Sequence, residues 1–195
     1  MRSVGLVLLA SGESQRMGTP KQALSFGGTS LLAHAVQTAK GSLCRPVVVT
    51  LGAYANVLKP LISSKDLQII TVEDWQEGMN VSIRAGIKSI LEQNEVDAII
   101  LMTCDQPYLT SALLNQLIEV YEKTGTPVVS CAYAETVGIP TLFDRSLFSE
   151  LLRLPPGTGA KKLIASLSPE QITLVPFPQA ETDVDTPEDY AKLKK

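Results

Sequence analysis

The sequence predicts an α/β fold with a mainly parallel sheet and helices on both of its faces. Short apolar runs alternate with amphipathic stretches along the whole chain, which is typical of βαβ units. The first run, Val4–Ala10, is apolar throughout, as expected of a central strand that is buried on both faces. The 195 residues contain no internal repeat, low-complexity tract or charged linker, so we expect a single domain over residues 1–195.

The pattern of apolar residues predicts where each helix and strand lies along the chain. Ser30 and Thr110 each precede a helical stripe of apolar residues, and we expect both to be N-caps. Strands are predicted at residues 4–10, 46–51, 67–72, 96–102, 127–134 and 172–175, with a further candidate strand at 140–143. Helices are predicted at residues 31–39, 80–91, 111–121, 146–152, 159–166 and 187–193.

Composition argues against several classes of function. With a net charge of −3 and no basic cluster, the chain is a poor candidate for binding nucleic acid. The apolar run at residues 4–10 is too short to span a membrane and lacks a signal-peptide cleavage pattern. Cys44, Cys104 and Cys131 are far apart and form no CxxC pair, which favours reduced thiols over zinc or disulfides. We therefore expect a cytoplasmic protein without nucleic-acid or membrane partners.

The chain has one histidine, His34, which lies in a helical stretch. No nearby pattern supplies the serine and acid of a Ser-His-Asp triad, and one histidine cannot build a histidine-rich metal site. We expect His34 to have a structural role.

The loop at residues 9–21 follows the first strand, at the edge where open α/β sheets bind ligands. Small residues at 10–12 would let backbone N–H groups approach a triphosphate closely. Arg16 and Lys21 add two positive charges. The loop matches neither the GxxxxGK[ST] nor the GxGxxG pattern, so both common nucleotide motifs are disfavoured. The alternative is an ordinary turn with solvated basic residues.

This loop resembles the signature LAAGxSxRMGxPK of the molybdopterin nucleotidyltransferase superfamily, especially its molybdopterin cytidylyltransferase branch. The matching residues are Leu9, Ala10, Gly12, Ser14, Arg16, Met17, Gly18, Pro20 and Lys21. Ser11 stands where the family usually has alanine or glycine. The resemblance implies a three-layer, Rossmann-like nucleotidyltransferase fold in which this loop binds a nucleoside triphosphate.

A second segment, residues 75–86, is similar to the family element W-x-x-G-M-x-x-S-(L/I)-x-x-G. The resemblance implies that it lies beside the base and ribose, with Ser82 near the base. Gly78 would permit a tight turn, and the Ser82 hydroxyl could donate to or accept from a base edge. The alternative is a helix N-terminus in which Asn80 or Ser82 only caps.

Two acidic segments complete the resemblance. Asp105 lies in a DQP element after the fourth strand, and Asp183 and Asp185 lie in DVDTPED, which resembles the family's D-I-D-T-P-E-D. Carboxylates in these places can hold Mg²⁺ on a triphosphate, and acids at i and i+2 of an extended segment point the same way. We expect Asp105 with Asp185 or Asp183 to bind the metal. The alternatives are a turn acid at Asp105 and helix capping by Asp185 or Thr186.

These matches define the candidate residues. The nucleotide-binding candidates are Leu9, Ala10, Ser11, Gly12, Arg16, Lys21, Gly78, Ser82 and Asp105. The catalytic candidates are Arg16, Lys21 and Asp105, and the metal candidates are Asp105, Asp185 and Asp183. We expect the two cations to face the metal-bound acids with the polyphosphate between them.

The chain departs from the family in the half that receives the acceptor. Gly138-Ile139-Pro140 stands for a usual Gly-His-Pro, and residues 156–160 stand for a usual Gly-Asp-x-Gly-Ala. Val72 also replaces an asparagine before the tryptophan segment. The identity of the acceptor is therefore open.

The resemblance implies Mg²⁺-dependent transfer of a nucleoside monophosphate, with CTP favoured, to a phosphorylated small molecule. Molybdopterin or its molybdenum cofactor is the first choice of acceptor, and pyrophosphate is released. Guanylyl transfer to molybdopterin and cytidylyl transfer to a sugar-alcohol phosphate are alternatives. Two further alternatives are not enzymes: a non-catalytic nucleotide sensor and an α/β interaction module. The base and the oligomeric state are not determined by the sequence.

Overall fold

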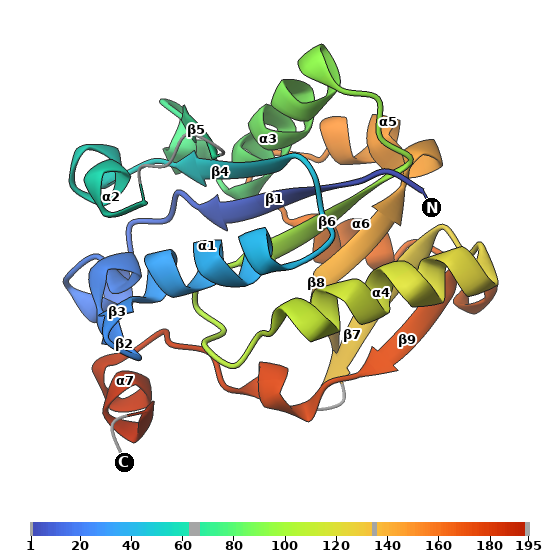
Figure 1. Ribbon diagram of the computed structural model, residues 1–195. Helices are drawn as coiled ribbons and strands as arrows, with labels where there is room; N and C mark the ends of the chain where they lie inside the picture. Colours follow the sequence, from blue (N-terminus) through green and yellow to red (C-terminus); the bar gives the residue numbers. More distant parts are fainter. Residues whose placement is uncertain (1, 63–66, 134–135, 194–195) are drawn as a thin grey trace.

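A computed structural model describes residues 2–62, 67–133 and 136–193, in which a central sheet lies between two layers of helices (Figure 1). The seven-stranded sheet has the order β5-β4-β1-β6-β8-β7-β9. Its strands are β1 Val4–Ala10, β4 Val47–Leu51, β5 Gln68–Thr71, β6 Ala98–Thr103, β7 Val128–Tyr133, β8 Thr136–Asp144 and β9 Ile172–Pro176. All neighbours pair in parallel except β8, which is antiparallel to both β6 and β7. The predicted α/β fold with a mainly parallel sheet is confirmed.

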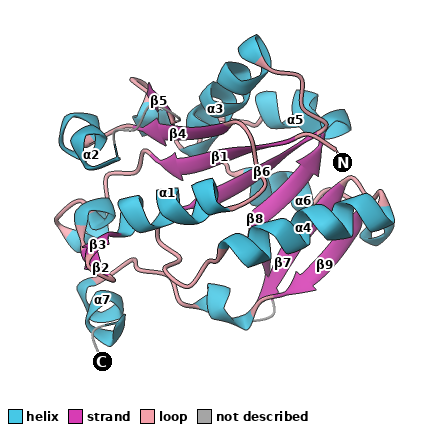
Figure 2. Ribbon diagram, viewed as in Figure 1, coloured by secondary structure: helices cyan, strands magenta, loops and turns pink. Residues whose placement is uncertain are grey.

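Helices cover both faces of the sheet, as the sequence predicted (Figure 2). They are α1 Leu31–Gly41, α2 Ala55–Ile62, α3 Met79–Gln93, α4 Ser111–Thr124, α5 Phe148–Leu152, α6 Ala160–Ile164 and α7 Pro187–Leu193. Alternate residues of β1 enter different cores: Leu6 and Leu8 pack with α1, α2 and α4, whereas Val7 packs with α3, α5 and α6. None of the helices in the described part combines the length and apolar composition that crossing a bilayer requires.

Several predicted boundaries agree with the structure. The first strand has the predicted bounds, and the Ser30 and Thr110 hydroxyls accept hydrogen bonds from the Ala33 and Leu113 N–H groups, 3.1 and 3.2 Å away. The strand predicted at 127–134 is described to its residue 133, and residue 134 lies outside the described residues. Strand β8 begins at Thr136, before the predicted 140, because it pairs along the length of β7.

Other elements were not predicted. Helix α2 contains Pro60, which disfavours a helical interpretation, yet Leu58 and Ile62 bury its apolar face. The hairpin of β2 Ser25–Phe26 and β3 Thr29–Ser30 is too short to produce a periodic pattern. The helix predicted at 159–166 is shorter, since α6 ends at Ile164.

The sheet reverses its order of connection between β1 and β6. After β1 the chain adds β4 and β5 on one side, and it then returns to add β6 on the other side of β1. The two strands run in register, from Val4 opposite Ala98 to Leu9 opposite Thr103, so their carboxyl ends lie at the same edge. Such a switch point opens the crevice in which α/β sheets bind ligands.

Candidate active site

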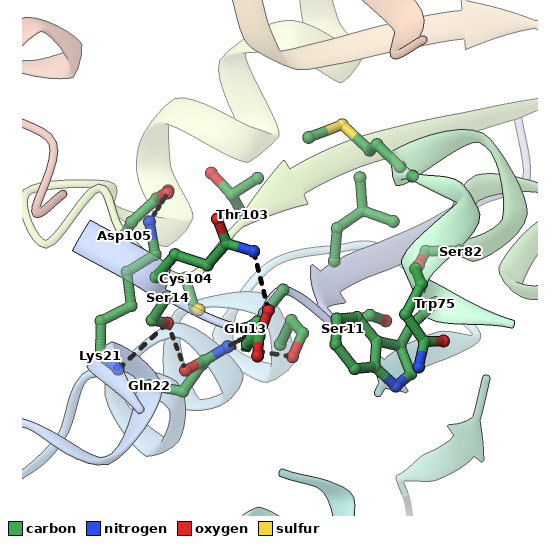
Figure 3. Close-up of a pocket in the computed structure, with 17 residues that line it drawn as sticks. Ser11, Glu13, Ser14, Lys21, Gln22, Trp75, Ser82, Thr103, Cys104 and Asp105 are labelled. Carbon is green, nitrogen blue, oxygen red and sulfur yellow. Dashed lines mark hydrogen bonds and ion pairs between the residues drawn. The ribbon is translucent and has the colours of Figure 1, made fainter. Parts of the chain in front are cut away.

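A cavity of about 340 Å³ lies at this switch point (Figure 3). Three segments line it: the loop after β1, the end of β6, and the turn that leads into α3. All of the predicted nucleotide-binding residues except Arg16 line this cavity: Leu9, Ala10, Ser11, Gly12, Lys21, Gly78, Ser82 and Asp105. The structure therefore brings together motifs that are far apart in the sequence.

The 9–21 loop is held in shape by two polar side chains. Ser14 adopts a left-handed conformation (φ 56°), and its hydroxyl donates to Gln22 Oε1 at 3.1 Å and accepts from the Lys21 N–H at 3.3 Å. Gln22 Nε2 donates to the carbonyls of Ala10 and Gly12, at 3.3 and 2.8 Å. Gln22 is only 1% exposed. Sequence reasoning missed this residue, because an isolated glutamine in a polar loop gives no pattern of its own.

The two glycines of the predicted site differ in whether the protein's own structure requires glycine. Gly78 has φ 111°, and a Cβ atom there would lie 2.8 Å from the Cα of Gly157, so the backbone itself requires glycine. Gly12 has no such φ, and a Cβ atom on it would meet no heavy atom within 4 Å. Neither conformation nor packing within the protein requires glycine at position 12, and the space beside it is open.

The start of α3 decides between the alternatives for residues 75–86. Gly78 is the N-cap residue of α3, so neither Asn80 nor Ser82 is the cap. The Asn80 side chain instead accepts a hydrogen bond from the Gly157 N–H at 3.2 Å and tethers the loop that precedes α6. Ser82 is 3% exposed and lines the cavity.

The predicted cations and acids meet in one cluster of ion pairs. Lys21 Nζ lies 2.7 Å from Asp105 Oδ2 and 2.7 Å from Asp185 Oδ1, and an Arg16 guanidinium nitrogen lies 2.7 Å from Asp185 Oδ2. Burial acts to lower the pKa of Lys21, but Asp105 and Asp185 outweigh it and raise that pKa. Burial likewise acts to raise the pKa of Asp185, and the cations Lys21 and Arg16 lower it.

The cations contact the acids directly in the free protein. The reason is electrostatic: opposite charges in a partly buried site attract most strongly when they pair at hydrogen-bond distance. The expectation that they face the acids across a polyphosphate concerns the nucleotide complex and stays a prediction. Lys21 and Arg16 would have to turn from the carboxylates toward phosphate oxygens when a nucleotide binds.

The same cluster tests whether the acids fit a divalent cation. Among the described residues, no group of three or more His, Cys, Asp or Glu side chains converges on one metal position. Mg²⁺, however, usually takes only one or two carboxylates and completes its octahedron with phosphate oxygens and water. Asp105 and Asp185 already share one cationic atom, the Nζ of Lys21. Their oxygen donors therefore fit a metal ion that a bound triphosphate helps to hold.

The C-terminal acids are anchored by the residue between them. Val184 is fully buried, and its N–H donates to the Asp105 carbonyl at 2.9 Å. Thr186 caps α7, since its hydroxyl accepts from the Asp189 N–H at 3.2 Å and the Asp189 carboxylate accepts from the Thr186 N–H at 3.1 Å. Thr186 is therefore the residue that caps α7, whereas Asp185 forms ion pairs with Lys21 and Arg16. Burial and the charges of Asp185 and Asp105 raise the pKa of Asp183.

A second cavity, of about 260 Å³, adjoins the first. Both are lined by Met79, Thr103 and Asp105, so the end of β6 lies between them. The second cavity is otherwise lined by Gln106, Tyr133, Ile139, Gly159, Ala160, Lys161 and Asp183. Ile139, which stands for the histidine of the usual Gly-His-Pro, lines only the second cavity, so this departure from the family changes the second cavity rather than the first.

The remaining sequence expectations concern His34 and the cysteines. His34 Nε2 lies 3.0 Å from the Pro107 carbonyl, and its ring makes an edge contact with Phe26 at 4.9 Å between centroids. These contacts agree with a structural role that supports the loop after β6. Cys44, Cys104 and Cys131 are all buried free thiols.

The chain is similar in sequence to known proteins along most of its length. A sequence model of the MobA-like NTP transferase domain matches residues 6–172. Nicotine blue oxidoreductase of Paenarthrobacter nicotinovorans is 28% identical, over 96% of this chain and 94% of its own length. A probable molybdenum cofactor guanylyltransferase of Bacillus cereus is 27% identical, over 64% of this chain and 61% of its own length.

Solved structures agree with the sequence comparison. The crystal structure of Rv0371c from Mycobacterium tuberculosis H37Rv has a TM-score of 0.85 and 30% identity, and the match covers 100% of both chains. A structure of Rv0371c in complex with manganese has a TM-score of 0.80 and 27% identity, over 99% of this chain and 98% of that one.

Proposed function

Because the chain belongs to the MobA-like NTP transferase family and is thus a nucleotidyltransferase, we propose that it transfers CMP from CTP to molybdopterin or its molybdenum cofactor. The family match confirms the resemblance drawn from the 9–21 loop. The observation that carries the proposal is the cluster of ion pairs between Arg16, Lys21, Asp105 and Asp185. Within it, Lys21 lines the first cavity and Asp105 lines both.

The two cavities divide the substrates between them. The larger cavity contains the 9–21 loop and the start of α3, which suit the triphosphate and the base. The smaller cavity would hold the acceptor, with its phosphate near Asp105 at the shared boundary. This arrangement would align the acceptor oxygen with the α-phosphorus, and alignment is a large part of catalysis in transfers of this kind.

In the proposed reaction an acceptor phosphate oxygen forms a bond to the α-phosphorus, the bond from that phosphorus to the bridging oxygen breaks, and pyrophosphate leaves. The acceptor phosphate is already ionised near neutral pH, so no general base is required. Lys21 and Arg16 would neutralise the charge that develops on the α-phosphate and on pyrophosphate. Mg²⁺ held by Asp105 with Asp185 or Asp183 would neutralise further charge on the phosphate oxygens. The manganese complex of Rv0371c supports a divalent cation in this family.

Other nucleotide bases and other acceptors are the main alternatives to this proposal. The name of the Bacillus cereus relative supports the molybdenum cofactor as acceptor but favours guanylyl transfer. Pro20-Lys21-Gln22 also resembles the corresponding segment of the enzymes that transfer a cytidylyl group to a sugar-alcohol phosphate, which favours that acceptor. A non-catalytic nucleotide sensor would keep the first cavity and lack acceptor chemistry in the second. We place the reaction in the cytoplasm, which agrees with three buried free thiols.

Ligand-dependent unfolding tests the donor. CTP, GTP, ATP and UTP are added singly with Mg²⁺, and Mg²⁺ and each nucleotide are also tested alone. At about 100 times its Kd, the true donor with Mg²⁺ should raise the Tm by about 5–10 °C. Mg²⁺ alone should have little effect, because Lys21 already occupies the place between the two carboxylates. No shift with any nucleotide would contradict the proposal.

Pyrophosphate release tests the acceptor. Molybdopterin, its molybdenum cofactor and a sugar-alcohol phosphate are each supplied with the nucleotide that stabilises the protein. Release that depends on molybdopterin supports the proposal, and binding without release from any acceptor supports the sensor. NADH and NADPH oxidation is measured in parallel, since one relative is named an oxidoreductase. Oxidation without pyrophosphate release would contradict the transferase proposal.

A further inference from the structure

Gln22 is the most buried polar residue among those that line the first cavity, and the proposed reaction does not use it. It is 1% exposed and lies in a short 3₁₀ helix, Lys21–Ala23, directly after the 9–21 loop. Burying an amide is unfavourable unless it forms hydrogen bonds. The three hydrogen bonds of this side chain all go to the 9–21 loop (Figure 3). The side chain therefore serves the shape of that loop.

The Gln22 amide turns two carbonyl groups of the loop to the same side. Its Nε2 donates to the Ala10 carbonyl at 3.3 Å and to the Gly12 carbonyl at 2.8 Å. The peptide bonds that follow these two residues are both trans. In a planar trans peptide the N–H points in the direction opposite to the carbonyl. The N–H groups of Ser11 and Glu13 therefore point away from Gln22.

The loop residues that carry these N–H groups border open space. Ser11, Gly12 and Glu13 all line the first cavity, and a Cβ atom on Gly12 would meet no heavy atom within 4 Å. Two N–H groups that point the same way form a small concave site for an anion. The peptide after Gly12 is the easiest to reverse, because glycine has no Cβ to restrict its backbone. Reversal would turn a carbonyl oxygen toward the phosphates, and the hydrogen bond from Gln22 opposes it.

A second chain of hydrogen bonds connects Gln22 to the backbone of Lys21. The Ser14 hydroxyl donates to Gln22 Oε1 at 3.1 Å and accepts from the Lys21 N–H at 3.3 Å. Ser14 has a left-handed backbone (φ 56°), which is costly for a residue with a side chain and persists only where its surroundings hold it. Gln22 thus helps to fix the backbone from which the Lys21 side chain extends to Asp105 and Asp185.

We propose that Gln22 is a positioning residue, whose amide holds the Ser11 and Glu13 N–H groups and the Lys21 backbone in place for a triphosphate. This inference rests on the proposed function, since it requires a triphosphate at the 9–21 loop. Gln22 acts through the loop and has no contact with the base. Its loss should therefore weaken every nucleoside triphosphate by the same factor.

Gln22→Met tests the inference, because methionine is close to glutamine in length and forms none of these hydrogen bonds. Calorimetric titration with CTP, GTP, ATP, UTP and tripolyphosphate, all with Mg²⁺, gives the Kd values. Each Kd should rise about tenfold or more, the effect of losing one hydrogen bond to a charged group. The factor should be the same for the five ligands, so the preference among the four bases should not change. The Tm of the free protein should fall, since two loop carbonyls lose their donor.

Gln68→Met is the matched control. Gln68 Nε2 donates to the Ser89 hydroxyl at 2.6 Å, and Gln68 does not line the first cavity. This variant should lower the Tm and leave every Kd unchanged, which separates positioning of the loop from a loss of stability. Ser14→Ala breaks only the link to Lys21 and should raise the five Kd values by a smaller common factor, about threefold. It carries the test where Gln22→Met does not fold.

Other results overturn the inference in distinguishable ways. Unchanged Kd values in a folded Gln22→Met protein would show that the amide serves only the fold, and the proposed function would stand. Weakening of one base more than the others, with tripolyphosphate unchanged, would show that Gln22 contacts the base instead of positioning the loop. Failure of the wild-type protein to bind any of the five ligands would overturn both proposals.

Discussion

The side-chain nitrogen of Lys21 lies 2.7 Å from a carboxylate oxygen of Asp105 and 2.7 Å from one of Asp185. These bonds connect residues that are 84 and 164 positions apart in the chain. One ammonium group therefore links the 9–21 loop, the end of β6 and the segment before α7. The same three segments supply the proposed phosphate and metal ligands, so the ion pairs already hold them near one another in the free protein.

Replacing Lys21 should affect catalysis more strongly than replacing Arg16. Lys21→Met is expected to lower kcat by about 10²–10³, the usual effect of losing one group that stabilises transition-state charge. Arg16→Met should lower it by only about tenfold, because the Arg16 side chain is 68% exposed and that of Lys21 is 16% exposed. The Tm of Lys21→Met should also fall, since Asp105 and Asp185 lose their shared cation. Steady-state pyrophosphate release measures kcat, and Lys162→Met, at an exposed site on α6, is the control. A Lys21→Met enzyme with wild-type kcat would exclude the assigned role.

Gly12→Ala should separate binding from folding. A Cβ atom at this position contacts nothing within 4 Å, so the Tm should be unchanged or slightly higher. The added methyl group would, however, occupy the space through which the loop backbone approaches phosphate, and the Kd for nucleotide should rise about tenfold or more. Gly18→Ala is the matched comparison: its φ of 65° is left-handed, so it should lose about 1 kcal/mol of stability. If Gly12→Ala binds nucleotide normally, the loop does not hold phosphate as proposed.

Asp183 and Asp185 should respond to neutralisation in opposite directions at pH 7. Asp185 is held by Lys21 and Arg16, and Asp185→Asn should lower the Tm by about 2–4 °C, or about 1 kcal/mol. Asp183 is partly desolvated and repelled by Asp185 and Asp105, so Asp183→Asn should raise the Tm, on the order of 1 °C. Thermal unfolding without added metal measures both variants. Shifts of the same sign would contradict this account of the cluster.

The lowered pKa of Asp144 predicts that the folded protein loses stability in acid. Burial acts to raise its pKa, but hydrogen bonds from the Tyr121 hydroxyl and the Ser146 N–H outweigh burial and lower it. A lowered folded-state pKa adds stability above the unfolded value of 3.8, and this stability is lost as pH falls through the folded value. Asp144→Asn should therefore lose about 1 kcal/mol at pH 7, after allowance for its partial exposure.

The same loss should be smaller at pH 3 than at pH 7, because pH 3 lies below the unfolded value of 3.8 and the carboxyl of the unfolded chain is then mostly protonated. Chemical denaturation at the two pH values measures the difference. Glu92→Gln, at an exposed site on α3, should show little effect at either pH. A loss in Asp144→Asn that is the same at both pH values would show that the charge of Asp144 does not contribute.

The parts of the fold that sequence predicted are those set by neighbouring residues. The bounds of β1 follow from an uninterrupted apolar run, and the Ser30 and Thr110 caps follow from a hydroxyl placed before an apolar stripe. Helix α2 was missed because Pro60 obscures its local pattern, while burial of Leu58 and Ile62 against the rest of the molecule stabilises it.

The candidate site, like the fold, has features that the sequence predicted and features that only the tertiary structure revealed. Sequence alone determined which residue types follow which strand, and the family resemblance predicted that Arg16, Lys21, Asp105 and Asp185 lie in one site. Only the tertiary structure decided that Lys21 pairs with both acids and that Val184 anchors the C-terminal segment to Asp105. The physical reason is range: backbone propensity and capping act over a few residues, whereas burial and ion pairing depend on segments that lie far apart in the sequence, up to 164 positions in the case of Lys21 and Asp185.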